Sequence, residues 1–356
     1  MATVAHCDCS MPYRYGCGTI KIEYNSMSQS NRVNFPIDLV YLWVDDKDPV
    51  WREKRNKYLN SNIDTSNNNA SRWCENDELK YSLRSVEKYA PWINHIYIVT
   101  DNQCPQWLDV NHPKIDIVDH SQILDKEALP IFNSSAIESR IHRIPNLGEH
   151  FIMGNDDTLF VKPVDPEHFF QPDGTPIIRL NEHKFHREKA KKSGNNYKQI
   201  LVRMQDLISN KFGANMYHAP HHNFDAYRLS HFKESIDIYP EQWNKTSYNR
   251  FREHEDMHRS FVSYYAIVTG KATLRKVGRY NRTKGVLGAV KALATNRFAA
   301  DSRCIPLTTK DYQAEMHKYN PLMICMNDGE GATDNDRRRM VAFLNNIFPN
   351  KSSFEK

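Results

Sequence analysis

The sequence has 356 residues, of which 40% are hydrophobic and 26% charged, and it carries a formal net charge of +5. This composition fits one large or two smaller globular domains. No apolar run approaches the roughly eighteen residues that cross a bilayer, so a membrane span is excluded, and the mild positive charge points only weakly to phosphorylated or polyanionic ligands.

Residues 1–34 are rich in Ser, Asn, Cys and Tyr, show no period, and are expected to form an N-terminal arm. Their start lacks the basic and apolar segments of a signal peptide. Cys7, Cys9 and Cys17 with His6 could bind zinc, but a fourth ligand at standard spacing is missing, so a loose segment is favoured. Seven scattered cysteines argue against a disulfide framework and for a reducing cytosol.

Strands and helices are then predicted in alternation. Residues 37–44 read Ile-Asp-Leu-Val-Tyr-Leu-Trp-Val, which predicts a buried strand that leads to Asp45. The Asn- and Ser-rich residues 59–72 predict a loop. Residues 76–90 predict a helix, because Asn is a good N-cap, two acids follow it, apolar side chains recur on one face, and Pro91 ends it.

Two further strands are predicted at 94–99 and 114–118, which lead to Asp101 and Asp119. A second helix is predicted over 134–144, where isoleucines fall on one narrow stripe at 3.6 periodicity. The apolar run after it ends abruptly in Asn155-Asp156-Asp157.

Four apolar runs therefore finish on carboxylates, at Asp45, Asp101, Asp119 and Asp156/Asp157. Together with the alternating helices, this pattern predicts an α/β domain with a mostly parallel sheet and a ligand site beyond the carboxyl ends of its strands. The simpler alternative is that Asp only caps strands, and that the Asn-Asp-Asp tripeptide closes a hairpin between 151–153 and 158–161.

The second half of the chain has a different character. A charge run occupies 183–192, and a helix is predicted over 196–212. The basic stretch 274–297 could meet a membrane surface or an anionic substrate, although solvated packing is favoured. We expect an α/β core over about 35–180 and 300–350, with a helical, basic insertion over about 181–300.

Ser134, Glu138 and His142 are spaced four apart on the predicted 134–144 helix, so they share one face. This face either points into the cleft, or Glu138 and His142 form an exposed pair. Arg250 and Arg252 flank one Phe, so in an extended segment they would project to one side and could hold phosphate oxygens. The alternative for the two arginines is a surface ion-pair cluster with the acids that follow them.

The stretch 217–222 holds three histidines, His218, His221 and His222, which suits either a zinc site or a catalytic or phosphate-binding His. Asn327-Asp328 before two glycines is an oxygen-ligand pair on a turn. The chain has neither a Gly-x-Ser-x-Gly elbow nor a Walker loop. Carboxylates on strand ends, paired arginines and histidines therefore favour metal-assisted phosphoryl or glycosyl transfer over acyl transfer.

Four segments in order carry a resemblance to a known family. They are Ile37–Pro49, Asn76 to Phe160, His218-Ala219-Pro220 with Arg250-Phe251-Arg252 and Asp256, and Asn327-Asp328 followed by Phe348-Pro349. In these segments the chain resembles the Stealth proteins, sugar-1-phosphate transferases that include bacterial capsule and cell-wall phosphotransferases and the animal N-acetylglucosamine-1-phosphotransferase. The match runs from about residue 36 to the C-terminus, with Asp46 standing where the first segment usually has Gly.

The resemblance implies a Rossmann-like, glycosyltransferase-A-like nucleotide-sugar core that moves a sugar-1-phosphate from a UDP-sugar to a hydroxyl of an oligosaccharide or lipid-linked saccharide acceptor. A phosphodiester would form and UMP would leave. Asp157 resembles the general base, with His218, Arg252 and Glu138 in the same catalytic site. Asp156, Asn327 and Asp328 would hold Mg²⁺ or Mn²⁺. The substrate-binding residues implied are Asp45, Asn76, Asp77, Arg84, His142, Arg143 and Arg250.

Two other functions fit parts of the pattern. A metal-dependent glycosyltransferase would release UDP instead of UMP, but its usual Asp-x-Asp is not obvious here. A polyanion- or RNA-binding module would use the basic stretches and leave the strand-end carboxylates unexplained, so no nucleic-acid partner is expected. We expect a cytoplasmic enzyme, peripheral at the inner face of the plasma membrane where lipid-linked acceptors reside.

Overall fold

A computed structural model describes residues 32–59, 74–278, 285–329 and 331–356. The candidate zinc ligands His6, Cys7, Cys9 and Cys17 and most of the predicted loop 59–72 lie outside the described residues. Among the residues that are described, no helix is both long and apolar enough to cross a membrane.

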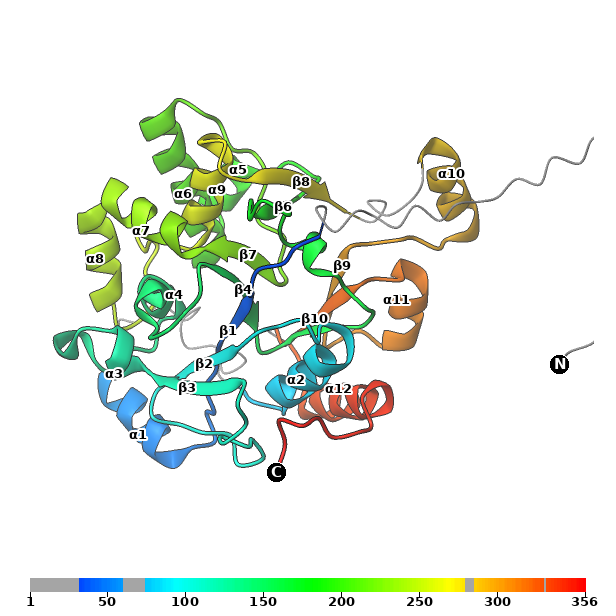
Figure 1. Cartoon of the computed structure of the whole chain (residues 1–356), viewed down its shortest axis with the longest axis horizontal. Coiled ribbons are helices and arrows are strands. Elements are labelled where there is room, and N and C mark those ends of the chain that lie inside the picture. The colour runs from blue at the N-terminus through cyan, green and yellow to red at the C-terminus, as the bar shows by residue number, and fades with distance from the viewer. Residues whose placement is uncertain (1–31, 60–73, 279–284, 330) are drawn as a thin grey trace, which may run out of the picture. The chain divides into compact units, whose positions relative to one another are not determined.

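The central element is a five-stranded sheet with the order β3-β2-β1-β4-β7 (Figure 1). Its strands are β1 (Asp38–Leu42), β2 (Ile96–Thr100), β3 (Ile115–Asp119), β4 (His150–Asn155) and β7 (Asp225–Arg228). The first four run parallel and β7 pairs antiparallel with β4. The predicted α/β class with a mostly parallel sheet is confirmed, as are the predicted strands at 37–44, 94–99 and 114–118.

Side chains alternate between the two faces of the sheet along each strand, and an apolar cluster covers each face. Leu39 and Tyr41 of β1 point into one apolar cluster with helix α2 (Glu78–Tyr89), while Val40 points into the other. That second cluster includes apolar side chains of α6 (Asn196–Phe212) and α9 (Ser260–Val268). The helix predicted over 196–212 is therefore confirmed, and it covers one face of the sheet.

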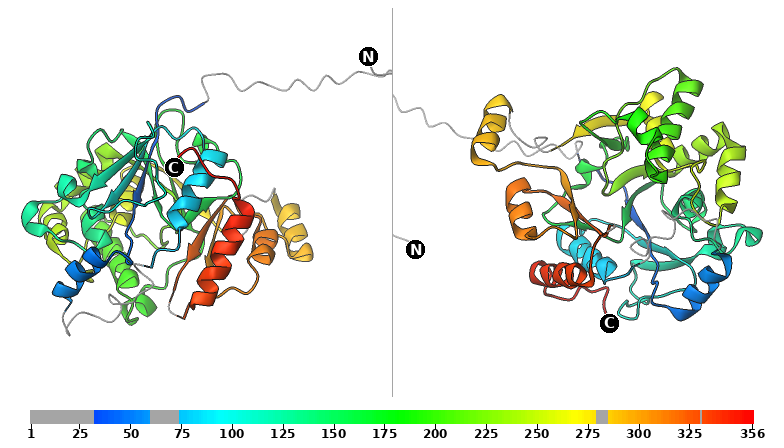
Figure 2. Two further views of the ribbon diagram at one scale, coloured as in Figure 1. Left: turned by 90° about the horizontal axis from the view of Figure 1, so that it is seen from below. Right: turned by 180° about the vertical axis from the view of Figure 1, so that it is seen from behind.

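Two smaller sheets complete the fold. One has the order β5-β10-β9, formed by β5 (Thr158–Phe160), β10 (Met323–Asn327) and β9 (Ser302–Pro306). Helix α12 (Asp334–Ile347) packs on it and lies alongside α2 (Figure 2). The other sheet pairs β6 (Ile177–Asn181) with β8 (Thr273–Val277). The remaining helices are α1 (Pro49–Tyr58), α3 (His120–Ile123), α4 (Ser134–Glu138), α5 (Arg187–Lys191), α7 (Leu229–Ile238), α8 (Pro240–Tyr248), α10 (Gly285–Thr295) and α11 (Tyr312–Tyr319).

The hairpin interpretation of the Asn-Asp-Asp tripeptide is wrong. β4 and β5 flank it but belong to different sheets, because β5 pairs antiparallel with β10. The tripeptide is thus the crossing between the central sheet and the small sheet, which brings the end of β10 close to the end of β4.

The predicted helix over 134–144 is only partly correct. Helix α4 ends at Glu138, where the Ser139 hydroxyl donates to the carbonyl of Ala136, and a short 3₁₀ turn follows over Ile141–Arg143. Serine competes in this way with the backbone bonds of a helix. The isoleucine stripe stays buried, but the change in winding separates Glu138 from His142, so they do not share a face.

The expected insertion over 181–300 also contributes to the sheet, since β7 lies within it. A buried ion pair joins the segments at the two ends of this region. The guanidinium of Arg179 on β6 lies 3.3 Å from Asp301, and His168 lies 3.1 Å from the same carboxylate. Burial acts to raise the pKa of Asp301, but His168 and Arg179 hold it well below its usual range. Asp301 is therefore ionised in the folded protein.

We predict that Asp301→Asn destabilises the fold by about 3–5 kcal/mol at neutral pH, because it leaves the Arg179 guanidinium buried without its counter-charge. A carboxyl with a lowered folded pKa stabilises above its unfolded pKa of about 4 and loses that contribution as the pH falls below it. The difference in the free energy of unfolding between wild type and variant should therefore become smaller in acid. Urea unfolding at neutral and at acid pH, followed by tryptophan fluorescence, measures the loss of stability and its pH dependence.

The matched control is Asp237→Asn, since Asp237 is exposed on α7. It should stay within about 0.5 kcal/mol of the wild type, as surface substitutions usually do. An Asp301→Asn variant as stable as this control at neutral pH would contradict the importance of the ion pair.

Candidate active site

A cavity of about 660 Å³ lies beyond the carboxyl ends of the parallel strands. Residues that follow β1, β2, β4 and β10 line it, which is where open α/β sheets bind ligands. Six of the predicted site residues come together in its lining: Glu138, Asp156, Asp157, Arg252, Asn327 and Asp328. Asp101 also lines it, with its carboxylate 2.7 Å from the ammonium of Lys54.

The paired carboxylates after β4 are the most perturbed groups in the cavity. Both keep some exposure to it, yet protein surrounds them on the other sides. Burial, the Asp157 charge and Glu75 raise the pKa of Asp156 to about 8. Burial also raises the pKa of Asp157, against the opposing effects of His222 and the Cys325 thiol. Such carboxylates hold a proton or attract a cation at neutral pH.

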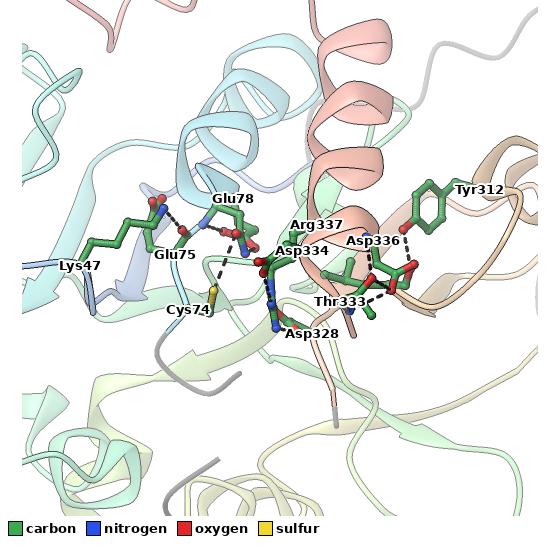
Figure 3. Close-up of polar contacts among 12 residues, drawn as sticks. Lys47, Cys74, Glu75, Glu78, Tyr312, Asp328, Thr333, Asp334, Asp336 and Arg337 are labelled. Atoms are coloured by element: carbon green, nitrogen blue, oxygen red, sulfur yellow. Dashed lines mark hydrogen bonds and ion pairs between the residues drawn. The ribbon is translucent and has the colours of Figure 1, made fainter. Parts of the chain in front are cut away.

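Two further acids join this cluster from the start of α2. Glu78 is buried and lines the cavity, and burial together with Asp156 raises its pKa to about 8. Glu75 has its pKa raised to about 7, first by burial and then by Glu78 and Asp77. Across from them, Arg337 of α12 holds both oxygens of Asp328 at 2.8 and 3.2 Å (Figure 3). Asp328 is thereby fixed in place.

Two arginines supply positive charge to the same cavity, Arg259 buried and Arg252 half-buried. Arg259 donates to Glu138 at 3.1 Å and lies 4.0 Å from Asp225. Burial acts to lower the pKa of Arg259, but these carboxylates and Tyr227 raise it above its usual range. Arg252 is hydrogen-bonded to the Ser134 hydroxyl at the start of α4. Both guanidiniums are therefore charged and held by rigid elements.

Two histidines complete the polar lining. His258 is neutral, because burial and the nearby arginines lower its pKa well below the usual range. Its Nδ1 accepts from the Ser260 amide, so its Nε2 carries the proton and faces Glu138 at 3.8 Å. His222 lines this cavity too.

An aromatic pocket forms the opposite part of the lining. Trp51 and Phe132 meet edge to face at 5.6 Å, and Phe251 stacks on Phe132 at 5.4 Å. Trp43, after β1, also lines the cavity but packs in the apolar cluster of Leu39 and Tyr41, and its indole nitrogen is buried without a hydrogen-bond partner among the residues described. Planar rings and a spare N–H donor suit a flat heterocycle with carbonyl groups.

A second cavity of about 600 Å³ adjoins the first at His222, which lines both. Its lining is rich in basic groups, from Lys184, Lys189, Lys198 and Arg303, with Glu182 as the acid. This cavity is thus suited to anionic or strongly polar ligands.

One group of His, Cys, Asp or Glu side chains among the described residues brings ligand atoms within 4.8 Å of one another, namely Asp157, His222 and Cys325. The Cys325 thiol lies 3.1 Å from Asp157 Oδ2 and donates to it. The trio joins the ends of β4 and β10 at the junction of the two cavities.

Other predicted residues lie outside the lining of the first cavity. Arg84 is bidentate to Glu355 at 2.7 Å, and Arg143 is paired with Asp125 at 2.7 Å. Arg250 stacks over Tyr58 and donates to the Pro130 carbonyl, so it does not project with Arg252. The others outside the lining are Asp45, Asn76, Asp77, His142 and His218. Their roles remain predictions.

The reasons differ from residue to residue. His142 lies outside the cavity that holds the carboxylates, and burial, Arg140 and Arg143 lower its pKa to about 4. His218 Nδ1 faces the carbonyl of Asn181 at 2.8 Å. Asn76 was expected to be the N-cap of α2. The N-cap residue is instead Asp77, which has a φ of 66°.

Three residues that line the cavity were not predicted from the sequence: Arg259, Glu78 and His258. Glu78 was interpreted only as an acid at a helix start, and Arg259 lies in a stretch with no distinctive pattern. Arg259 is placed by its contact with Glu138, which lies 121 residues earlier in the chain.

Comparisons of the chain with known proteins found relatives over most of its length. Residues 35–63 match the model described as Stealth protein CR1, conserved region 1, and residues 72–178 match Stealth protein CR2, conserved region 2. The chain is 34% identical over 329 residues to the capsular polysaccharide phosphotransferase LcbA of Aeromonas hydrophila, covering 90% of this chain and 86% of that protein.

It is also 36% identical over 338 residues to an exopolysaccharide phosphotransferase of Streptomyces coelicolor, covering 91% of this chain but 53% of that longer protein. Among solved structures, it is similar to the galactosyltransferase LgtC in complex with donor and acceptor sugar analogues. The identity there is 9% and the TM-score 0.40, over 89% of this chain and 97% of the other.

Proposed function

This chain belongs to the Stealth family of capsular and exopolysaccharide phosphotransferases, and we propose that it transfers a sugar-1-phosphate from a UDP-sugar to a hydroxyl of an acceptor saccharide. In this reaction the acceptor oxygen bonds to the β-phosphorus. The bond from that phosphorus to the bridging oxygen breaks, a phosphodiester forms, and UMP leaves.

The observation that carries the proposal is the meeting of carboxylates and arginines in one cavity. Asp156, Asp157 and Asp328 share it with Arg252 and Arg259. Phosphoryl transfer requires little covalent chemistry from the protein, and depends on positioning and on neutralising the phosphate charge. The two arginines, held by Ser134 and Glu138, would bind the phosphate oxygens of the donor.

A divalent cation fits the acidic part of the cavity. Asp156, Asn327 and Asp328 offer the oxygen ligands that Mg²⁺ and Mn²⁺ prefer, and burial together with the charges of Asp157 and Glu75 raises the pKa of Asp156. We propose these three as the metal ligands. Such a cation would neutralise the diphosphate and help the uridine phosphate to leave. Arg337 keeps the Asp328 carboxylate oriented toward this role.

Asp157 is the proposed general base. Its Oδ1 has no hydrogen-bond partner among the residues described, while its Oδ2 accepts from the Cys325 thiol. A pKa raised by burial makes the carboxylate a stronger base than in water. One oxygen is thus oriented by the protein and the other is left for the acceptor hydroxyl proton.

The two remaining features of the site suit the two substrates. The aromatic pocket of Trp51, Phe132 and Phe251 would hold the uracil ring of the donor. The basic second cavity would admit the acceptor, which reaches Asp157 past His222. UDP-sugar and acceptor would then approach from separate cavities.

A UDP-sugar labelled at the β-phosphate tests the function directly. The label should appear in the saccharide product, and unlabelled UMP should be released, because the bond that breaks lies between the two phosphorus atoms. Release of labelled UDP with none in the product would contradict the proposal and favour a glycosyltransferase instead.

We predict that Asp157→Asn lowers kcat by roughly 10²–10⁴-fold with little change in KM, because it removes only the proton acceptor. The thermal midpoint should not fall, since Asn removes a desolvated charge. Steady-state kinetics of UMP release and circular dichroism measure the two effects. Asp237→Asn is the matched control and should turn over normally; a folded Asp157→Asn with near-normal kcat would refute the role.

Helix α10 supports a peripheral position at a membrane, where a lipid-linked acceptor resides. Leu287 and Val286 are 85% and 79% exposed, and Leu293 continues the same face. The basic Lys291 and Arg297 lie beside them, exposed, which suits an anionic lipid surface.

We predict that the protein co-sediments with vesicles containing phosphatidylglycerol and that Leu287→Glu weakens this binding, because it places a charge in the apolar face. Val110→Glu, at an apolar position 45% exposed elsewhere, is the control and should bind as the wild type does. Equal sedimentation of both variants would contradict a membrane role for α10.

A further inference from the structure

The geometry of Asp157, His222 and Cys325 has a chemical meaning that the proposed reaction does not use. The three side chains come from the end of β4, from the segment before β7, and from β10. Each offers one ligand atom, and these atoms all lie within 4.8 Å of one another. The proposed phosphosugar chemistry uses the Cys325 thiol only to orient Asp157, and it gives the His222 imidazole no chemical role.

Nitrogen, sulfur and oxygen together form the ligand set of zinc. Zn²⁺ binds Cys, His and Asp in a tetrahedron with bonds of about 2.0–2.3 Å, which places ligand atoms on the order of 3.5 Å apart. The distance from Cys325 Sγ to Asp157 Oδ2 is already 3.1 Å. Mg²⁺ takes oxygen ligands and rejects thiolates, so this trio is chemically distinct from Asp156, Asn327 and Asp328.

A fourth ligand stands next to the trio. Cys304 on β9 is the register partner of Cys325 on β10, and the parallel pairing puts the two side chains on the same face of the small sheet. The two thiols are close enough to interact with each other. Cys304 is therefore a candidate fourth ligand, and a water molecule would serve otherwise.

An ion can reach Asp157 and His222 through the cavities, and Cys325 is buried just beyond them. His222 lines both cavities, Asp157 lines the larger one, and Cys304 lines the basic one. Binding would replace the hydrogen bond between the Cys325 thiol and Asp157 with two metal–ligand bonds, and the thiol proton would pass to solvent. Without an ion, the Cys325 thiol donates to Asp157 Oδ2, while Asp157 Oδ1 has no hydrogen-bond partner among the described residues.

We propose that Asp157, His222 and Cys325 form a reversible Zn²⁺ site, and that zinc bound there inhibits the enzyme by occupying Asp157. The inhibition half rests on the proposed function, in which Asp157 accepts the proton of the acceptor hydroxyl. A carboxylate bound to Zn²⁺ cannot accept that proton. The binding half stands on the ligand geometry alone.

Cobalt(II) is the probe for the binding half, because tetrahedral Co²⁺ with a cysteine ligand gives visible d–d bands and a thiolate-to-metal charge-transfer band. We expect the full chain to develop both with one equivalent of Co²⁺, and to lose them when Zn²⁺ but not excess Mg²⁺ is added. Cys325→Ser should lose the charge-transfer band, and His222→Gln should weaken Co²⁺ binding by at least about tenfold.

Cys104→Ser is the matched control for cysteine content. Cys104 is exposed and its thiol contacts its own neighbour Pro105, so this variant should keep both bands. Absence of the charge-transfer band in the wild type would overturn the site. So would a band that persists in Cys325→Ser.

Zinc titration of UMP release tests the inhibition half. Wild-type turnover with Mg²⁺ present should fall as Zn²⁺ is added and recover with a chelator. Each variant is compared with its own zinc-free rate, and Cys325→Ser should need at least about tenfold more Zn²⁺ for the same fractional loss. Cobalt bands without zinc inhibition would overturn the regulatory role. If UMP release fails altogether, the spectra still decide whether the metal site exists.

Discussion

Crowded carboxylates at the end of β4 are the constraint on which the rest of the site depends. Asp156 and Asp157 leave the sheet side by side, and Glu78 approaches from α2, so negative charge accumulates where water is largely excluded. Like charges in such surroundings raise one another's pKa or attract cations. Burial and then the charge of a neighbouring carboxylate raise the pKa of Asp156 and the pKa of Glu78, each to about 8.

Two arginine side chains of the site form ion pairs with other carboxylates than Asp156, Asp157 and Glu78. Arg259 is held between Glu138 of α4 and Asp225 of β7, and Arg337 is held by Asp328. Both arginines are therefore fixed before any ligand arrives, which is the preorganisation that phosphoryl transfer requires. The antiparallel strand β7 matters for the same reason, because it supplies Asp225 from the region first expected to be a helical addition.

The sequence could predict what local pattern determines. Apolar runs and their terminal acids located β1 to β4 and the cavity beyond them, and Asn327-Asp328 stood out beside two glycines. It could not predict contacts between distant segments, such as Arg259 with Glu138, nor that Arg250 would stack on Tyr58. A helix periodicity also concealed the break after Glu138, because the isoleucines stay buried in either winding.

The central claim is that this cavity joins two sugars through a phosphate, and ³¹P NMR spectroscopy of the purified saccharide product tests it most directly. The account predicts one phosphodiester resonance, coupled to the anomeric proton of the transferred sugar and to the proton beside the acceptor hydroxyl oxygen. A product without phosphorus, in which the two sugars are joined by a glycosidic bond, would contradict it.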